Sequence, residues 1–365
     1  MSRMKSEPTD LSVQDLLDAA TNICGKSVEL RLIDAIQPIR FYVLATSIYH
    51  LFDTGIFDIL CQNGESSIKN LGKEKGLEQD KLSGFLKYLK NEGIVDEREG
   101  CFSLTAKGKS LSNFRGWYTM LIGGYGQTFL QVGEKLKKGA GWATRDATKV
   151  GIGSCEISHY DAIPLTRDLI AEIPKSCRRL LDLGCGNGLY LVDFCKAFPE
   201  IEAWGVEPDE GSYRAATELV RQVGLQNRIK LTRNSAVEFL HSDFNYQPDF
   251  IVMGFVLHEI LNQEGEAGIV NFLLQITKRF PDIYIIVIEV DLKIDAPTIM
   301  QHGLSLAYYN PYYLLHYFTN QRLETQLFWE QLFAKCQLDL IAKKTTDIQV
   351  DSTGLEIGYL LKRKE

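Results

Sequence analysis

The C-terminal half of this chain alternates short apolar runs with longer amphipathic stretches, and this alternation constrains the fold more than any other feature. The amphipathic stretches carry apolar residues at helical spacing, whereas the short runs have the length and composition of buried strands. Such an order is typical of repeated βαβ units, so the sequence predicts an α/β fold with a doubly wound, mainly parallel, Rossmann-like sheet. The predicted strands lie within residues 178–183, 201–207, 228–234, 248–258 and 283–291.

A glycine-rich turn connects the first of these runs to the helix that follows it, with the sequence Asp182-Leu-Gly-Cys-Gly-Asn-Gly188. Glycines let the backbone turn tightly and approach a ligand, and the helix start offers free N–H groups. Glu207 stands nineteen residues after Gly188, at the end of the next run, where a carboxylate can accept hydrogen bonds from both hydroxyls of a ribose. A dinucleotide site would have its third glycine where Leu189 stands, so the spacing favours another nucleoside ligand.

The Asp-x-Gly-x-Gly-x-Gly spacing resembles motif I of the class I S-adenosylmethionine-dependent methyltransferases. In that family the turn passes beside the methionine part of the cofactor, and the acid that ends the second strand holds the ribose. The third run ends in Asn-Ser, where the family usually has a polar residue near the adenine, although its usual Gly-Asp pair is missing here. The resemblance implies S-adenosyl-L-methionine as cofactor and a set of residues that bind it: Asp182, Gly184, Gly186, Gly188, Glu207, Asn234 and Ser235.

The N-terminal region predicts a second domain. Three helical stretches precede two short extended pieces that flank a charged, glycine-containing tip, which is the winged-helix order, and Pro38 should kink or divide the long helical run at 28–60. The region resembles the dimerisation domain of small-molecule methyltransferases, which implies a homodimer. We expect a winged-helix-like dimerisation domain at 1–112, a helical connector and cleft wall at 113–175, and a methyltransferase domain at 176–365.

The composition indicates a globular protein that acts on small molecules. The chain has 365 residues, of which 45% are hydrophobic, and a net charge of −7. This acidic balance argues against nucleic acid as a partner, because phosphate neutralisation needs a dense basic face. The start, MSRMKSEPTD, shows no secretory signal or membrane span, and eight cysteines without a CxxC pair indicate reduced thiols. We therefore expect a cytoplasmic protein with no membrane partner.

Six histidines limit the candidates for acid–base or metal chemistry. His258 ends the fourth run, at the sheet edge where ligand crevices form. In plant-type O-methyltransferases a histidine at this place is the general base, and the alternative is a buried histidine held by backbone partners. Beyond the fifth run the sequence leaves the O-methyltransferase pattern, because the Gly-Gly-Lys-Glu-Arg turn is absent and the tyrosine-rich segment from His302 to Arg322 replaces it.

That segment, together with Leu257-His-Glu259 and Gly141-Trp-Ala-Thr-Arg145, resembles the α-keto acid C-methyltransferases of non-ribosomal peptide precursor pathways. Members act on phenylpyruvate, 2-ketoarginine and branched-chain keto acids, and they hold a metal ion through two histidines. The resemblance implies methylation of the β-carbon of a 2-keto acid through a metal-stabilised enolate, before a transaminase makes a β-methyl amino acid. The implied metal is a transition metal ion, with iron or zinc favoured, and the keto acid side chain stays open.

The resemblance also implies roles for single residues. The metal ligands are His258 and His316, with His302 as the alternative to His316; a packing role among tyrosines would also explain His316. Glu259 is a water-mediated base or an orienting carboxylate, unless it is a surface acid at a helix start. Arg145 pairs with the substrate carboxylate, unless it is an ordinary surface arginine. Aromatic candidates for the cavity wall are Trp117, Trp142, Tyr308, Tyr309 and Tyr312.

Two other functions stay open from the sequence. A metal-free O- or N-methyltransferase would use His258 as its general base. A non-catalytic regulator would keep the winged helix for DNA and the second domain as a cofactor sensor. The acidic balance and the intact glycine turn count against the regulator.

Overall fold

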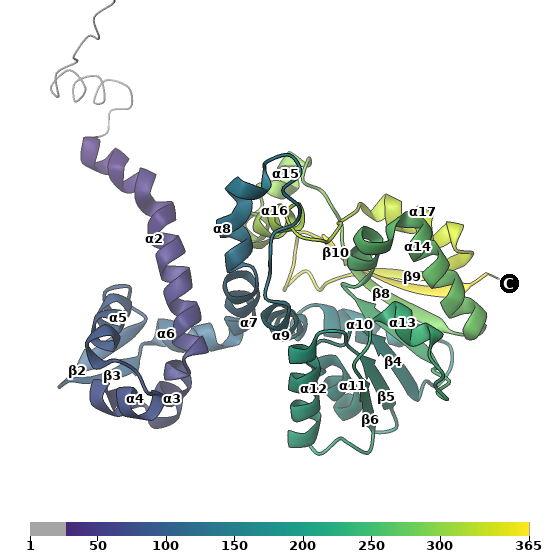
Figure 1. Cartoon of the computed structure of the whole chain (residues 1–365), viewed down its shortest axis with the longest axis horizontal. Helices are drawn as coiled ribbons and strands as arrows, with labels where there is room; N and C mark the ends of the chain where they lie inside the picture. Colours follow the sequence, from purple (N-terminus) through teal and green to yellow (C-terminus); the bar gives the residue numbers. More distant parts are fainter. Residues whose placement is uncertain (1–26, 365) are drawn as a thin grey trace, which may run out of the picture. The chain divides into compact units, whose positions relative to one another are not determined.

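The computed structural model describes residues 27–364 and divides into two compact units, one ending at Lys109 and the other beginning at Ser110 (Figure 1). The polar start of the chain, residues 1–26, and Glu365 lie outside the described residues. The segment that we expected to be a separate connector, 113–175, belongs to the second unit.

The first unit combines helices with a small antiparallel sheet of order β1-β3-β2. Its hairpin, β2 and β3, is the pair of extended pieces that the sequence predicts around a charged tip. The core is formed by apolar side chains of the helices and the hairpin, among them Leu51, Leu60, Leu86 and Phe102. The elements are α2 (Val28–Asp53), α3 (Ile56–Asn63), β1 (Glu65–Ser67), α4 (Ile68–Lys75), α5 (Gln79–Asn91), β2 (Val95–Arg98), β3 (Cys101–Leu104) and α6 (Ala106–Ser110).

The first long helical run does not divide at Pro38, which corrects the expectation from sequence. Helix α2 continues through Pro38 to Asp53, and α3 follows a bend of 67°. Proline removes one helical hydrogen bond, but this part of α2 is exposed, so water can bond to the carbonyl that lacks its donor. The break comes instead at Gly55, whose φ of 74° is the left-handed conformation that stops a helix.

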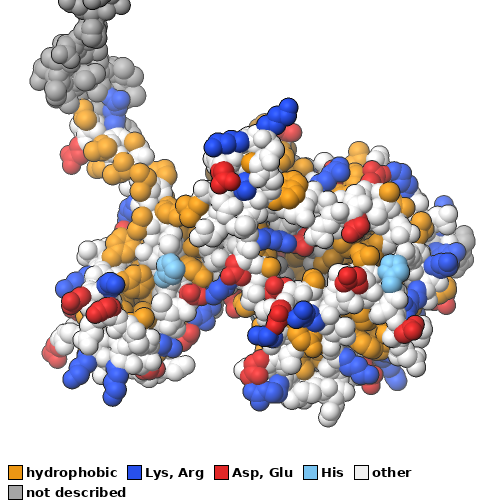
Figure 2. Space-filling view, viewed as in Figure 1, with side chains coloured by type: hydrophobic (Ala, Val, Ile, Leu, Met, Phe, Trp, Pro, Cys, Tyr) orange, Lys and Arg blue, Asp and Glu red, His pale blue; other side chains and the backbone are white. Residues whose placement is uncertain are grey.

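Helix α2 exposes an unusual amount of apolar surface (Figure 2). Of the helices that the structure describes, none alone is long and apolar enough to cross a membrane, and α2 with α3 meets that test only as a bent pair. Contiguous exposed apolar patches on globular proteins usually mark an interaction surface. The exposed side chains are Val28, Leu30, Leu32, Ile33, Ile36, Ile39, Phe41, Tyr42 and Val43.

The second unit is built on a seven-stranded sheet of order β6-β5-β4-β7-β8-β10-β9. Strands β6, β5, β4, β7 and β8 run parallel, whereas β10 is antiparallel to β8 and to β9. The doubly wound, mainly parallel sheet is thus confirmed, and the β9–β10 hairpin is an addition that the sequence did not predict. The strands are β4 (Arg179–Leu183), β5 (Glu202–Val206), β6 (Ile229–Thr232), β7 (Phe250–Gly254), β8 (Tyr284–Val290), β9 (Leu338–Thr345) and β10 (Glu356–Arg363).

Helices cover both faces of this sheet. Apolar side chains of α10 (Ala162–Ile170), α11 (Leu189–Ala197) and α12 (Glu210–Gln222) form one core with the strands. Those of α13 (Ala236–His241), α14 (Leu257–Arg279) and α17 (Gln326–Lys335) form the other. Every residue of β8 is buried, as expected for a central strand covered on both faces.

A third apolar cluster joins two segments that are far apart in the chain, the stretch before the sheet and the stretch after β8. Met120, Tyr125 and Ile157 pack there with Tyr312 and Tyr313. An Asn-Pro pair often marks a turn, but Asn310-Pro311 is helical, because η3 leads directly into α16. The elements are η1 (Leu111–Phe114), α7 (Arg115–Tyr118), η2 (Thr119–Gly124), α8 (Gly126–Lys135), α9 (Ala147–Ser158), α15 (Pro297–Met300), η3 (Ser305–Tyr309) and α16 (Asn310–His316).

Candidate active site

The second unit contains a cavity of about 540 Å³ at the carboxyl ends of its parallel strands. Its wall comes from the glycine turn after β4, from α9, from the first turn of α14, and from η3 and α16. In doubly wound sheets this edge is the usual place of a ligand crevice. The cavity brings together most of the residues that the sequence singled out.

The glycine turn forms one end of the cavity and is packed too tightly for side chains. Gly184 has a φ of 93°, and a Cβ there would lie 2.5 Å from Cγ2 of Val256. Gly186 has a φ of 53°, and a Cβ there would lie 2.7 Å from Sγ of Cys155. Both glycines line the cavity, whereas Gly188 caps α11 and does not. A ligand at this end meets bare backbone.

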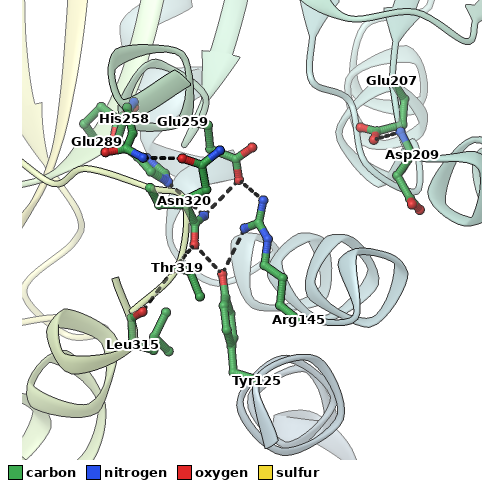
Figure 3. A network of polar contacts seen from close by, with 12 residues as sticks. Tyr125, Arg145, Glu207, Asp209, His258, Glu259, Glu289, Leu315, Thr319 and Asn320 are labelled. Carbon is green, nitrogen blue, oxygen red and sulfur yellow. Dashed lines mark hydrogen bonds and ion pairs between the residues drawn. The ribbon is translucent and has the colours of Figure 1, made fainter. Parts of the chain in front are cut away.

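Glu207 stands beside this turn, directly after β5. Its Oε2 accepts a hydrogen bond from the Gly186 N–H at 2.9 Å, and its Oε1 accepts one from the Asp209 N–H at 2.9 Å. Burial raises the pKa of Glu207 to about 7, although the two N–H donors oppose the shift. Burial and the charge of Glu207 raise the pKa of Asp182 to about 8. Both carboxyl groups line the cavity, and Glu207 lies well apart from His258 (Figure 3).

Asn234 and Ser235, the two residues at the end of the third predicted strand, differ in their access to the cavity. Ser235 lines the cavity and caps α13, with its hydroxyl accepting from the Glu238 N–H. Asn234 is not among the lining residues, and its side-chain oxygen accepts from the Ser235 N–H. Ser235 is therefore the member of the pair that a ligand can reach.

His258 and His316 lie next to each other at the other end of the cavity, with their ring centroids 5.2 Å apart. Both are buried, at 2% and 4% exposure. Nδ1 of His258 is 2.9 Å from Oε2 of Glu289, and Nδ1 of His316 is 2.7 Å from the Tyr312 carbonyl oxygen. Each Nδ1 must donate to these oxygens, so the lone pair of each neutral ring resides on Nε2.

The two Nε2 atoms differ in their surroundings. That of His316 is buried without a hydrogen-bond partner, and that of His258 lies 3.3 Å from the side-chain nitrogen of Gln321. Burial opposes the charged form of His258, but the charge and hydrogen bond of Glu289 outweigh it and raise the pKa. Burial, followed by the neighbouring His258, holds the pKa of His316 well below its usual value.

His258 reaches this place in the first turn of α14, whereas the sequence placed it at the end of a strand. Strand β7 ends at Gly254, and the chain turns sharply at Phe255, whose φ of 58° is rare outside glycine. The turn is held by a hydrogen bond from the Phe255 N–H to the Ile288 carbonyl oxygen. Backbone strain of this kind is usually found at functional sites.

A polar network joins the histidine end to Tyr125, which precedes α8, and to Arg145, in the loop before α9 (Figure 3). Oε1 of Glu259 accepts from Nη2 of Arg145 at 2.9 Å and from Nε2 of Gln321 at 2.8 Å. The Tyr125 hydroxyl accepts from Nη1 of Arg145 at 3.3 Å and donates to Oε1 of Gln321 at 3.1 Å. Burial disfavours the charge of Arg145, but the carboxylate of Glu259 keeps its pKa above the usual value.

Sequence reasoning missed Glu289, Gln321 and Tyr125. Glu289 had a signal, since it is the one charged residue in the apolar strand Tyr284–Val290. Gln321 and Tyr125 had none, because they meet across 196 positions of sequence. Both were hidden among other polar and aromatic residues.

Some of the remaining candidate residues line the cavity, and others lie outside it. His302 is exposed, and its Nε2 lies 3.1 Å from the Ser352 hydroxyl, outside the cavity. Tyr308 and Tyr312 line the cavity, whereas Trp117 and Tyr309 do not. Trp142 lines a smaller hollow of about 170 Å³, which also touches His316.

No group of three or more His, Cys, Asp and Glu side chains at metal-binding spacing is found within residues 27–364. The histidine pair supplies two neutral nitrogen donors. A metal held there would need further ligands from substrate or water, as open catalytic sites do.

A methyltransferase domain model matches residues 158–343. The 2-ketoarginine methyltransferase of Streptomyces arginensis is 40% identical over 342 residues, which cover 92% of this chain and 97% of that one.

Two solved structures show the same fold. The N,N-8-amino-8-demethyl-D-riboflavin dimethyltransferase of Streptomyces davawensis aligns with a TM-score of 0.60 at 15% identity, over 93% of this chain and all of that one. Human N-acetylserotonin methyltransferase, solved with S-adenosylmethionine, aligns with a TM-score of 0.64 at 13% identity, over 94% of this chain and 99% of that one.

Proposed function

Because this chain belongs to the S-adenosylmethionine-dependent methyltransferases, we propose that it adds a methyl group to the β-carbon of a 2-keto acid and that a transition metal ion, iron or zinc, binds His258 and His316. The relative from Streptomyces arginensis, whose printed substrate is a 2-keto acid, supports this substrate class. The observation that carries the proposal is the histidine pair itself.

The donor set of this pair fits a metal ion. Histidine ligands usually donate their second ring nitrogen to a carboxylate or carbonyl, which fixes the tautomer. His258 does so with Glu289 and His316 with the Tyr312 carbonyl, so both Nε2 atoms carry the lone pair; that of His316 is unpartnered, and that of His258 has only the Gln321 amide nitrogen at 3.3 Å for a metal ion to displace. The buried Nε2 of His316 has no hydrogen-bond partner within the described residues, which is costly unless something binds it.

The proposed chemistry is attack of carbon on the sulfonium methyl. The C3 proton of a 2-keto acid leaves, the carbon forms a bond to the methyl carbon, and the C–S bond breaks to release S-adenosylhomocysteine. A metal ion bound by the keto and carboxylate oxygens would supply the acidity that this C3 proton lacks.

Residues of the polar network would orient the substrate. A guanidinium has five N–H donors, and Arg145 uses two of them on Glu259 and Tyr125, so it retains donors for a substrate carboxylate. Glu259 accepts both of its bonds through Oε1, so Oε2 is the oxygen that can receive the C3 proton, directly or through water. Gln321 holds Glu259 in place.

The cofactor would occupy the other end. We propose that Gly184 and Gly186 pass beside its methionine part, that Glu207 accepts from the ribose hydroxyls and that Ser235 lies near the adenine. Asp182 and Gly188 would shape the turn, and Asn234 would act through Ser235.

The proposal is tested with full-length protein, S-adenosylmethionine and a panel of 2-keto acids: phenylpyruvate, 2-ketoarginine and 4-methyl-2-oxovalerate. We expect methyl transfer to C3, located by NMR of the product, loss of activity after exhaustive chelation, and recovery when iron or zinc is restored. Full activity after chelation would instead support a metal-free O- or N-methyltransferase with His258 as base. A methyl group on oxygen or nitrogen would contradict C-methylation.

We further infer that the first unit is a winged-helix-like dimerisation domain whose α2 packs against a second copy of the chain. The exposed apolar side chains of α2 support this, since they are too many for an isolated surface helix. Light scattering should show a homodimer at micromolar concentration. The double variant Ile36→Glu, Ile39→Glu should be monomeric, and a monomeric wild-type protein would contradict the inference.

A further inference from the structure

A pair of carboxyl groups, Asp161 and Glu356, lines the same cavity and has no role in the function proposed above. Asp161 precedes α10, and Glu356 is the first residue of β10. Because β10 runs antiparallel to β8, this first residue lies opposite Val290 at the carboxyl end of β8, where the cavity is. The pair exists only because the unpredicted hairpin brings Glu356 there.

The two acids are short of positive charge. Glu356 is 4% exposed, and its Oε1 accepts from the Thr346 hydroxyl at 2.7 Å. Oδ1 of Asp161 accepts from the Ala162 N–H. Arg145 is the only lysine or arginine among the residues that line the cavity in the described structure, and it is paired with Glu259.

Burial raises the pKa of Asp161 to about 7 and that of Glu356 well above its usual value. Each carboxyl group acts on the pKa of the other, so the two lie within electrostatic reach of one another. Two neighbouring acids at a cavity wall, of which Glu356 is buried and Asp161 partly buried, are costly without a cation, and a bound cation would lower that cost.

A second, independent observation points to a ligand here. The Tyr190 side chain is 7% exposed and lines the cavity, and its buried hydroxyl makes no well-formed hydrogen bond to any described residue. Burial, followed by the charges of Glu356 and Asp161, raises the pKa of Tyr190, while the Ser158 side chain opposes this shift and Asp182 adds to it, so the hydroxyl lies within electrostatic reach of the acid pair. A polar hydrogen-bond donor would satisfy Tyr190 and both carboxyl groups at once.

A row of side chains on one helical face runs from the acid pair to the histidines. Tyr308, Tyr312 and His316 recur every four residues along η3 and α16, and all three line the cavity. The Tyr308 and Tyr312 ring centroids are 5.6 Å apart, and those of Tyr312 and His316 are 4.1 Å apart. Burial, followed by the charges of Asp161 and Glu356, raises the pKa of the Tyr308 hydroxyl, so Tyr308 lies at the end of this row that is near the acids. Two such ring-to-ring steps make a span that suits a short extended chain.

We propose that Asp161 and Glu356 form a subsite for a guanidinium group at the far end of the substrate, whose keto acid end lies at His258 and His316. This inference rests on the proposed function. Guanidinium is planar and bears several N–H donors, so it can bond two carboxylates and a hydroxyl together, whereas a neutral side chain would leave them unpaired. The acid pair would then select an arginine-like 2-keto acid over aromatic and branched ones.

The test compares 2-ketoarginine with its ureido counterpart, the neutral 2-keto acid in which oxygen replaces one guanidinium nitrogen. Wild-type protein should prefer 2-ketoarginine, and the ratio of the two kcat/KM values should fall on the order of 100-fold in Glu356→Gln and in Asp161→Asn. The matched control is Glu264→Gln, the same change at an exposed acid that also lines the cavity, and its ratio should stay within about twofold.

Two results would overturn the subsite: a wild-type preference for neutral keto acids, or a ratio that changes as much in Glu264→Gln as in Glu356→Gln. A binding measurement separates this failure from failure of the proposed function. Agmatine carries the guanidinium without the keto acid, so calorimetry with S-adenosylhomocysteine present should show agmatine binding that Glu356→Gln abolishes. If no keto acid is methylated but agmatine still binds in this way, the proposed function fails and the subsite stands. Absence of agmatine binding in folded wild-type protein would count against the subsite.

Discussion

The two ends of the cavity are built in different ways. The glycine turn and Glu207 come from one βαβ unit, 179–207, and a hydrogen bond within that unit joins them. The histidine end gathers α8, the loop before α9, the start of α14, β8, α16 and the loop after it. A turn made within one unit suits a ligand common to a whole family, whereas a wall made from many segments can vary with the substrate.

This contrast predicts different consequences for mutations at the two ends. Damage at the cofactor end should weaken binding of S-adenosylmethionine whatever the acceptor. Damage at the histidine end should leave cofactor binding intact and remove turnover. The four tests below run from the largest expected effect to the smallest.

Loss of either histidine should have the largest effect. In His258→Ala and His316→Ala, kcat/KM should fall on the order of 10³-fold and bound metal should disappear, because several kcal/mol of the barrier would depend on that ion. Elemental analysis and single-turnover kinetics check this, and calorimetry should show S-adenosylhomocysteine affinity near that of the wild type. The matched control, His302→Ala, should retain metal and turnover; metal loss in His302→Ala alone would reassign the ligand.

Glu207→Ala tests the cofactor end. Its carboxylate would accept charge-assisted hydrogen bonds worth about 1.5–3 kcal/mol, so affinity for S-adenosylhomocysteine should weaken by roughly 10- to 100-fold. Metal content should not change, since Glu207 lies apart from His258 (Figure 3). Unchanged affinity by calorimetry would remove Glu207 from the cofactor site.

Glu289→Gln tests whether the partner of His258 matters through its charge. The amide still accepts from Nδ1 of His258 but no longer makes the ring more basic, so metal affinity should fall by about tenfold. Competition with a chelator of known strength measures the affinity, and a thermal melt reports whether the protein stays folded. A well-folded variant with wild-type metal affinity would mean that Glu289 is needed only for packing.

The pH dependence of cofactor binding should give the smallest effect. The raised pKa of Glu207, about 7, means that lowering the pH protonates the carboxylate that would accept the ribose hydroxyls. Affinity for S-adenosylhomocysteine should therefore fall by up to about tenfold for each pH unit below 7 and level off above it. Asp182, with a pKa of about 8, and Asp209 face the same turn and would add their own dependence. Glu207→Gln should remove the part below pH 7, and a profile identical to the wild type would contradict this assignment.

Local patterns in the sequence predicted much of this structure. The alternating runs predicted the parallel strands, because burial on both faces makes each strand an apolar run. The glycine turn could be recognised because its demands on φ and on close approach act on consecutive residues. His258 was placed near the crevice by a rule about sheet edges, although its exact position depended on the strained turn at Phe255.

Contacts between distant segments could not be derived in the same way. Strand β9 is mostly exposed and has little apolar signal, so the β9–β10 hairpin was missed, and with it the position of Glu356 beside Asp161. Gln321 could not be recognised because its partners come from two distant segments, the residue before α8 and the first turn of α14. Periodicity and turn chemistry act over a few residues, whereas which side chains share a cavity follows from how whole elements pack. The cofactor end could therefore be predicted from the sequence alone, whereas the substrate end followed only from the tertiary structure.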